Sequence, residues 1–199
     1  MPVSCNKGPI QYTFEGTITE SVSQSAAEGV EILLYQKLVN NGVASNSFSF
    51  ATSTTSDIGG NYLMAINREK VTAFRLEFEK TNYFPVKIEV SSADITTENP
   101  NEFSEELEAI SWVNFQLKNT FPEDTDHFKL ITQTFREDCE GCAVNAVADF
   151  YGPLDTSFTY ATTAGEYVKF IYVNVTESTS TFDSIYTTPF ETIVYPIIY

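Results

Sequence analysis

Apolar and polar side chains alternate with a period of two along much of this chain. In residues 71–79, Phe74, Leu76 and Phe78 alternate with Arg75 and Glu77. Successive side chains of an extended strand point to opposite faces, so the pattern predicts a strand with one buried face. The same pattern predicts further strands at 10–20, 30–38, 48–52, 62–66 and 83–90. Short strands separated by turn residues are typical of a β-sandwich.

The second half of the chain repeats this organisation. Its predicted strands are 112–118, 128–135, 144–151, 158–161, 167–175, 185–186 and 193–198. The 11 tyrosines and 16 phenylalanines also favour pleated, half-buried surfaces. We therefore expect an all-β protein of two small antiparallel β-sandwiches, of which the second is immunoglobulin-like.

Residues 91–109 interrupt the alternation. They hold six acidic residues and no lysine or arginine, and Asn99-Pro100-Asn101 excludes a continuous strand. We expect a solvated excursion here, with one helical turn at 104–109 as an alternative. The predicted organisation is a tether at 1–9, one sandwich at 10–108 and another at 109–199. The alternative is that residues 112–117 form the last strand of the first sandwich.

A short glycine motif lies between two of the predicted strands. Asp57-Ile58-Gly59-Gly60-Asn61 predicts a hairpin turn, because glycine adopts positive φ and Asp or Asn can bond its own backbone. Its spacing after strands led by Gly16 and Gly29 resembles the transthyretin-like sandwich of carboxypeptidase regulatory-like domains. That resemblance implies a transthyretin-like fold for 10–108 and a scaffolding or interaction role. The histidine-rich motifs and Tyr-Arg-Gly-Ser tail of the purine-hydrolysing members are absent, so no activity carries over.

The charge balance of the chain disfavours some partners. Lys and Arg number 11 against 27 Asp and Glu, a formal charge of −16. Such a field repels phosphate, so we expect no nucleic-acid partner and no direct binding to anionic lipid. The acidity is typical of a solubilising surface. Weak calcium binding at the acidic loops is the alternative, although the chain has no EF-hand loop pattern.

The first nine residues resemble a membrane-attachment signal. Val3-Ser4-Cys5 resembles the end of a bacterial lipobox, and the polar residues 6–9 resemble a tether; Pro2 stands where leucine is usual. This resemblance implies a lipid on Cys5 and a Gram-negative outer-membrane lipoprotein, on either the periplasmic or the cell-surface side. A lipid chain holds a protein on a membrane without a spanning element. The alternative is an ordinary cysteine in a flexible terminus.

Cys139-Glu140-Gly141-Cys142 holds the two cysteines that lie close in sequence. A structural disulfide is the preferred interpretation, since the acidic neighbours disfavour the thiolate that a redox centre needs. A zinc site would need further ligands such as His127 and Asp126. We expect the disulfide, with no metal and no cofactor.

Candidate catalytic groups are few. His127 is the single histidine and lies in an acidic segment, where we expect it to be solvated; no serine has a G-x-S-x-G setting. Glu105 and Glu106 are adjacent, whereas glycosidase carboxylates face each other across a groove. The sequence therefore predicts a protein that is not an enzyme.

These observations lead to four functional hypotheses. We expect a non-catalytic cell-envelope lipoprotein that serves as a structural or protein-interaction module with an envelope protein as partner. The alternative is a carbohydrate-binding accessory lipoprotein whose exposed rings stack on glycan; its candidates are Trp112, Tyr151, Tyr160 and Tyr186. A third hypothesis is an enzyme, which would need a pocket that gathers His127 with a nucleophile and an acid. A fourth is adhesion or pilus assembly through residues 193–199, which could pair with a neighbouring strand.

Overall fold

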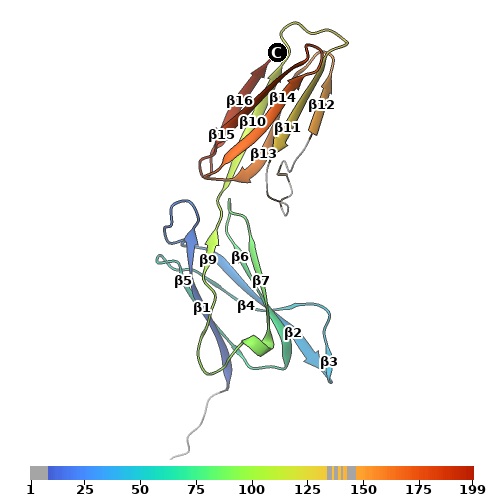
Figure 1. The fold of residues 1–199 in the computed structure, drawn as a ribbon. Coiled ribbons are helices and arrows are strands. Elements are labelled where there is room, and N and C mark those ends of the chain that lie inside the picture. The colour runs from blue at the N-terminus through green and yellow to red at the C-terminus, as the bar shows by residue number, and fades with distance from the viewer. Residues whose placement is uncertain (1–8, 134–135, 137–138, 140, 143–146) are drawn as a thin grey trace, which may run out of the picture. The chain divides into compact units, whose positions relative to one another are not determined.

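The computed structural model describes residues 9–133, 136, 139, 141–142 and 147–199 (Figure 1). The chain forms two compact units, Met1–Leu107 and Glu108–Tyr199. Each unit consists of two packed layers of strands, so the predicted all-β sandwich class is confirmed. The helical element of the described residues is one 3-10 turn, Ser92–Asp94 (η1). None of the described helices is long and apolar enough to cross a membrane.

The first unit builds two sheets. Its strands are β1 (Gln11–Glu20), β2 (Glu31–Asn40), β3 (Val43–Ala44), β4 (Ser49–Thr55), β5 (Asn61–Asn67), β6 (Val71–Glu79), β7 (Val86–Ser91), β8 (Asn101–Glu102) and β9 (Glu105–Leu107). One sheet has the order β5-β1-β8, with β9 also paired to β1. The other has the order β3-β2-β6-β7, with β4 also paired to β2.

Aromatic side chains fill the space between these sheets. Phe14 of β1 packs edge-on against Phe74 of β6, with ring centroids 5.2 Å apart. Tyr62 of β5 contacts Phe78 of β6 at 5.9 Å in the same manner. Phe74, Leu76 and Phe78 are all fully buried, as the alternation in this segment predicts. Rings from facing layers therefore form one core, which dominates the stability of the unit.

The predicted hairpin around Gly59-Gly60 is wrong. The strand before the turn, β4, pairs with β2, whereas the strand after it, β5, pairs with β1. The turn therefore carries the chain from one layer to the other. Its local chemistry is as expected: Asp57 Oδ1 accepts hydrogen bonds from the backbone N–H groups of Gly59 at 2.8 Å and Asn61 at 2.9 Å. Alternation and turn residues specify that the chain bends, but not which neighbour each strand finds.

The acidic segment is also more ordered than a solvated excursion. It contains β8 and β9, both parallel to β1. The alternative of a helical turn at 104–109 is wrong, because Glu105–Leu107 is a strand, and the Oγ of Ser104 accepts the backbone N–H of Thr17 at 3.0 Å. Gly16 makes the close approach possible, since a Cβ there would lie 2.0 Å from the carbonyl oxygen of Phe103. The fully buried Leu107 then closes the core of the first unit.

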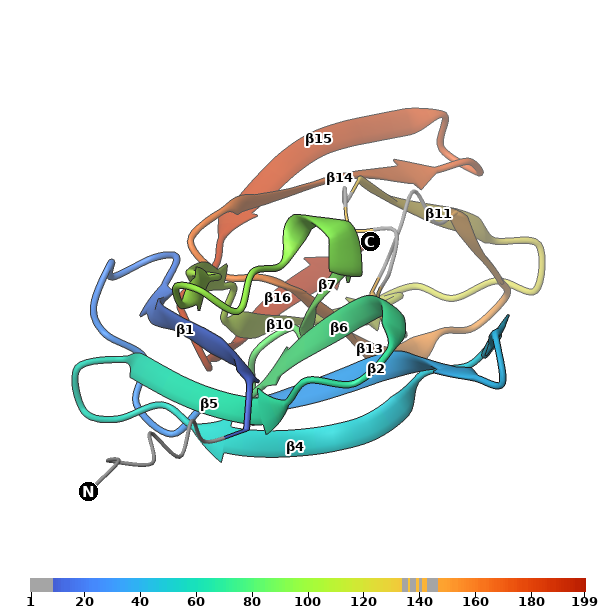
Figure 2. The same ribbon diagram turned by 90° about the horizontal axis from the view of Figure 1, so that it is seen from below.

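The second unit has its own pair of sheets. Its strands are β10 (Ile110–Lys118), β11 (His127–Gln133), β12 (Val147–Tyr151), β13 (Asp155–Thr163), β14 (Tyr167–Asn174), β15 (Thr179–Tyr186) and β16 (Thr192–Ile198). The sheet orders are β13-β10-β16 and β12-β11-β14-β15. Figure 2 shows β15 beside β14 in this second sheet.

The sandwiches are not purely antiparallel, which corrects the prediction. Pairs β1–β8, β1–β9 and β10–β16 are parallel. Parallel neighbours need a long connection, and in the second unit all the other strands lie between β10 and β16 in sequence. A pattern of alternating residues carries no information on strand direction.

The core of the second unit is again aromatic. Phe115 of β10 packs against Phe170 of β14 with ring centroids 5.0 Å apart. Tyr195 of β16 contacts the Phe170 ring with centroids 4.8 Å apart. Phe128 and Leu130 of β11 are buried beside them. These contacts fix which face of each strand points inward, and hence which residues are presented outward. The narrower transthyretin-like and immunoglobulin-like assignments of the two sandwiches stay predictions.

Candidate functional site

Cys139 and Cys142 are joined by a disulfide, with their Cα atoms 5.4 Å apart, which confirms the preferred interpretation of this motif. Gly141 and Cys142 lie against the edge of β13. There the backbone N–H of Ala161 donates to the carbonyl of Gly141 at 3.1 Å. A disulfide-bonded sulfur is not a zinc ligand in the thiolate form that such sites require. Among the described residues, no group of three or more Cys, His, Asp or Glu is arranged to hold a metal ion.

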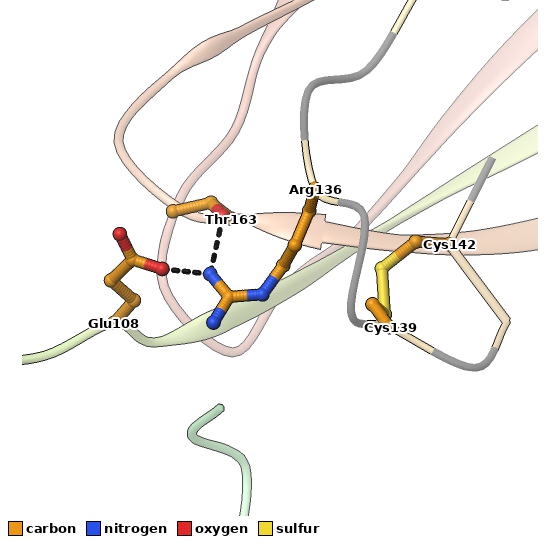
Figure 3. The surroundings of a disulfide bond; sticks show 5 residues. All are labelled: Glu108, Arg136, Cys139, Cys142 and Thr163. Carbon is orange, nitrogen blue, oxygen red and sulfur yellow. Dashed lines mark hydrogen bonds and ion pairs between the residues drawn. A yellow bond between two sulfur atoms is a disulfide. The ribbon is translucent and has the colours of Figure 1, made fainter. Parts of the chain in front are cut away.

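A cavity of about 240 Å³ lies beside this disulfide. Figure 3 shows the guanidinium of Arg136 between Glu108 and Thr163, with Nη1 donating to Glu108 Oε2 and to Thr163 Oγ1, the latter at 3.4 Å. The described lining includes no histidine, and its one cysteine, Cys142, is disulfide-bonded. The arrangement holds an ion pair, but it does not bring a nucleophile and a base together as covalent catalysis requires.

His127 is the first residue of β11, which corrects the expectation of a solvated position in a loop. Its Nε2 lies 2.7 Å from Asp149 Oδ1, and its ring stacks on Tyr151 with centroids 4.3 Å apart. Lys129 Nζ lies 3.1 Å from the same carboxylate oxygen. The hydrogen bond with His127, followed by that from Lys129, lowers the pKa of Asp149 below its ordinary 3.8. The described contacts of the imidazole include no serine or cysteine, so they form a cross-strand cluster and not a catalytic triad.

This cluster lies on the outer face of the β12-β11-β14-β15 sheet, which also carries a row of apolar residues. Cross-strand pairing places Val147 beside Ile131, Ile131 beside Ile171, and Ile171 beside Phe182. We call these four residues the apolar row. Val147 is 56% exposed and Phe182 59% exposed, and the two isoleucines between them are half-buried. Alternation predicts polar residues at such outward positions, so the row is the feature that strand-by-strand analysis missed.

Polar and aromatic pairs flank the apolar row. On one side Lys129 pairs with Asp149 across β11 and β12. On the other side lies Lys169 of β14, followed by Tyr167 and Tyr186, whose rings meet edge-on with centroids 5.2 Å apart. The face therefore has an apolar centre with a polar and aromatic border, as protein interfaces commonly do.

The four rings proposed for glycan stacking are not brought together. Tyr151 and Tyr186 lie on this outer face, but on its opposite edge strands, β12 and β15. Tyr160 contacts Phe115 and belongs to the core. Trp112 lies on β10, in the other sheet. The structure thus provides no shared platform from these residues, and this part of the carbohydrate hypothesis is not supported.

A second charged cluster occurs on the first unit, where the sequence predicted only outward polar residues. Glu77 points away from the core yet is almost fully buried, since Arg75 Nε lies 2.9 Å and Lys87 Nζ 3.5 Å from its Oε1. The Arg75 guanidinium in turn lies 4.8 Å from the ring of Tyr35 and 4.6 Å from that of Phe48. Cation–π contacts on both rings hold the arginine over the carboxylate, a structural role.

Two predicted attachment features have different outcomes. Cys5 lies outside the described residues, so lipidation stays a prediction. The C-terminal strand β16 pairs with β10, and in the described part of the chain its other edge has no strand partner. Pro196 in this strand lacks a backbone N–H, which limits pairing along that edge.

Comparisons with known proteins give a distant likeness in fold. No protein-family profile matches the chain, and no curated protein sequence matches it. Among solved structures, the Bacillus anthracis TIE protein is 7% identical with a TM-score of 0.41, covering 95% of this chain and 34% of its own. The shaft pilin SpaA of Lactobacillus rhamnosus GG is 10% identical with a TM-score of 0.37, covering 96% and 97%.

A 3-chlorocatechol 1,2-dioxygenase from Rhodococcus opacus 1CP is also 10% identical, with a TM-score of 0.37, and covers 54% of this chain and 62% of its own. The chain thus spans about a third of one of these proteins and under two thirds of another. A pilin and an enzyme stand at the same low score, so these likenesses give no argument about function.

Proposed function

We propose that this chain is a non-catalytic protein-interaction module of the bacterial cell envelope, held there by a lipid on Cys5. The observation that carries the proposal is the apolar row. It crosses all four strands of a sheet and is uncovered in the described structure. An apolar surface of this continuity indicates a binding face, whereas singly scattered apolar residues need no explanation.

The placement of reactive groups supports the same conclusion. In the described residues the single histidine is held by a carboxylate and a tyrosine ring, and the Cys139–Cys142 pair is oxidised. Disulfides persist in oxidising compartments, which agrees with a location in the envelope. A rigid sandwich with its function on an outer face is a common use of this architecture.

Purification from the natural producer tests the envelope location. We expect the protein in the membrane fraction and in the detergent-rich phase of a Triton X-114 extraction, because the acyl chains supply the apolar anchor. A Cys5→Ala variant should move to the aqueous phase, and mass spectrometry of the N-terminal peptide should show a diacylglyceryl thioether. Equal partitioning of the two proteins, with an unmodified Cys5, would refute the anchor.

Glycan binding is tested separately. A glycan array probed with the full chain should stay at background, since the candidate rings lie apart. A specific signal that is lost in Tyr151→Ala but kept in Trp112→Ala would move the function to the carbohydrate class.

A further inference from the structure

We propose that the outer face of the β12-β11-β14-β15 sheet joins two copies of this chain, with the apolar row of one copy against that of the other. This inference rests on the proposed interaction function and names its partner. It follows from three properties of the face: the register of the row, the distribution of charge and the symmetry of the row itself.

The register shows that the row is continuous. Ile131 is the direct neighbour of both Val147 and Ile171, and Phe182 continues the row on the next strand. Outward cross-strand neighbours lie about 5 Å apart, so the four side chains form one strip across the sheet. Water at this strip is released when it is covered, which is the driving force for association.

The charge distribution favours a second copy at this face. The chain carries −16 in total, so two copies repel each other over most of their surfaces. The outward charged residues of the four strands are Lys129, Asp149 and Lys169, which sum to +1 with the histidine neutral. Asp149 is already paired with Lys129 and His127. Two copies that meet here therefore repel each other less than two copies that meet through their acidic surfaces.

The order of the row is complementary to itself. A two-fold axis parallel to the strands, in the plane between two such faces, places β12 opposite β15 and β11 opposite β14. Val147 of each copy then lies opposite Phe182 of the other, and Ile131 opposite Ile171. An isologous contact of this kind closes as a dimer and leaves no free binding face.

The size of the face sets the expected strength. Four strands of about seven residues cover roughly 19 by 23 Å, which is below the ~800 Å² per partner of a standard interface. We therefore expect a weak dimer, with a dissociation constant on the order of 10–100 μM.

Sedimentation velocity of the full chain from about 5 μM to about 1 mM tests this dimer. The double variant Ile131→Thr, Phe182→Thr keeps β-branched or strand-compatible residues but removes apolar surface. Each change acts twice in a two-fold dimer, so the dissociation constant should rise on the order of tenfold or more. Val194→Thr is the matched control, since Val194 is 52% exposed on the other sheet of the same unit. It should leave the dissociation constant unchanged.

The salt dependence of association distinguishes a second copy of this chain from a partner of opposite charge. Raising NaCl from about 0.05 M to about 0.5 M screens the repulsion between two acidic chains, so the dimer should tighten. Circular dichroism and thermal midpoints establish that each variant is folded.

A monomer throughout the concentration range would overturn the proposal, as would equal weakening by the control variant. A dimer that dissociates with salt would also overturn it and indicate contact between Lys169 and acidic surface instead. These outcomes are independent of the anchor: a lipidated Cys5 with a monomeric chain removes only the dimer, and an unmodified Cys5 with a salt-strengthened dimer removes only the envelope location.

Discussion

Ser56 holds the crossover between the layers of the first unit, and its removal is predicted to destabilise that unit strongly. Its Oγ donates to the carbonyl of Ala27 at 2.6 Å and accepts the backbone N–H of Val30 at 2.9 Å. Ala27 and Val30 are fully buried and Ser56 is nearly so. Ser56→Ala therefore leaves one buried donor and one buried acceptor without this partner, at about 1–2 kcal/mol each.

We expect Ser56→Ala to lower the free energy of unfolding of the first unit by about 2–4 kcal/mol, a large part of a typical ~5–15 kcal/mol. For a unit of this size the corresponding fall in thermal midpoint is roughly 10–20 °C. Hydrogen exchange with mass spectrometry is the assay, because peptides from β2 and β4 follow this unit and peptides from β14 follow the other.

Ser53→Ala is the control, since Ser53 is exposed on β4 three residues away and the same atom is removed. It should change the free energy of unfolding by less than about 0.5 kcal/mol. If the two variants behave alike, the Ser56 hydrogen bonds do not carry the crossover and the reasoning from burial is refuted.

Three further predictions concern backbone, disulfide and ionisation. Gly60→Ala should prevent soluble expression or lower the thermal midpoint sharply, because φ is +74° and a Cβ would lie 2.3 Å from the carbonyl oxygen of Ile18. Gly42 is also at positive φ but has open space around it, so Gly42→Ala should lower the thermal midpoint much less in the same measurement. Reduction of the Cys139–Cys142 bond should cost the second unit about 2 kcal/mol in a urea titration, since the closed loop is short, and an unchanged midpoint would contradict this. Burial and the hydrogen bond to Asp183 raise the pKa of Tyr195 above its ordinary 10.0. The protonated Tyr195 hydroxyl therefore stabilises the fold fully below pH 10, and this stabilisation is lost as the pH rises through the raised pKa. Tyr195→Phe should therefore show a smaller loss of stability above pH 10 than the native chain.

The buried residues of the protein could be predicted from the local sequence pattern, but the pairing of its strands could not. Alternation identifies Phe74, Leu76 and Phe78 as inward residues, because a strand on a sandwich has one buried face. The same alternation does not say that β4 and β5 join different sheets, or that β8 and β9 run parallel to β1. Those choices depend on contacts between residues far apart in sequence, such as Gly16 with Phe103.

The candidate site shows the same limit. The Cys139–Cys142 bridge is a local feature and could be predicted from spacing and neighbours. The apolar row could not, since Ile131 and Ile171 become neighbours only through the register of β11 and β14. One signal was present in the sequence: Phe182 and Ile171 occupy the outward parity of their strands, where polar residues are typical.

Site-specific photo-crosslinking in intact cells tests the central claim most directly, namely that the outer face of the β12-β11-β14-β15 sheet is where this chain binds another protein. The crosslinker p-benzoylphenylalanine replaces Phe182 on the apolar row or, as the matched position on the other sheet, Val194. We predict a protein adduct from position 182 and none above background from position 194, because the row is the apolar centre of the binding face. An absence of adducts from position 182, or equal adducts from both positions, would contradict the account.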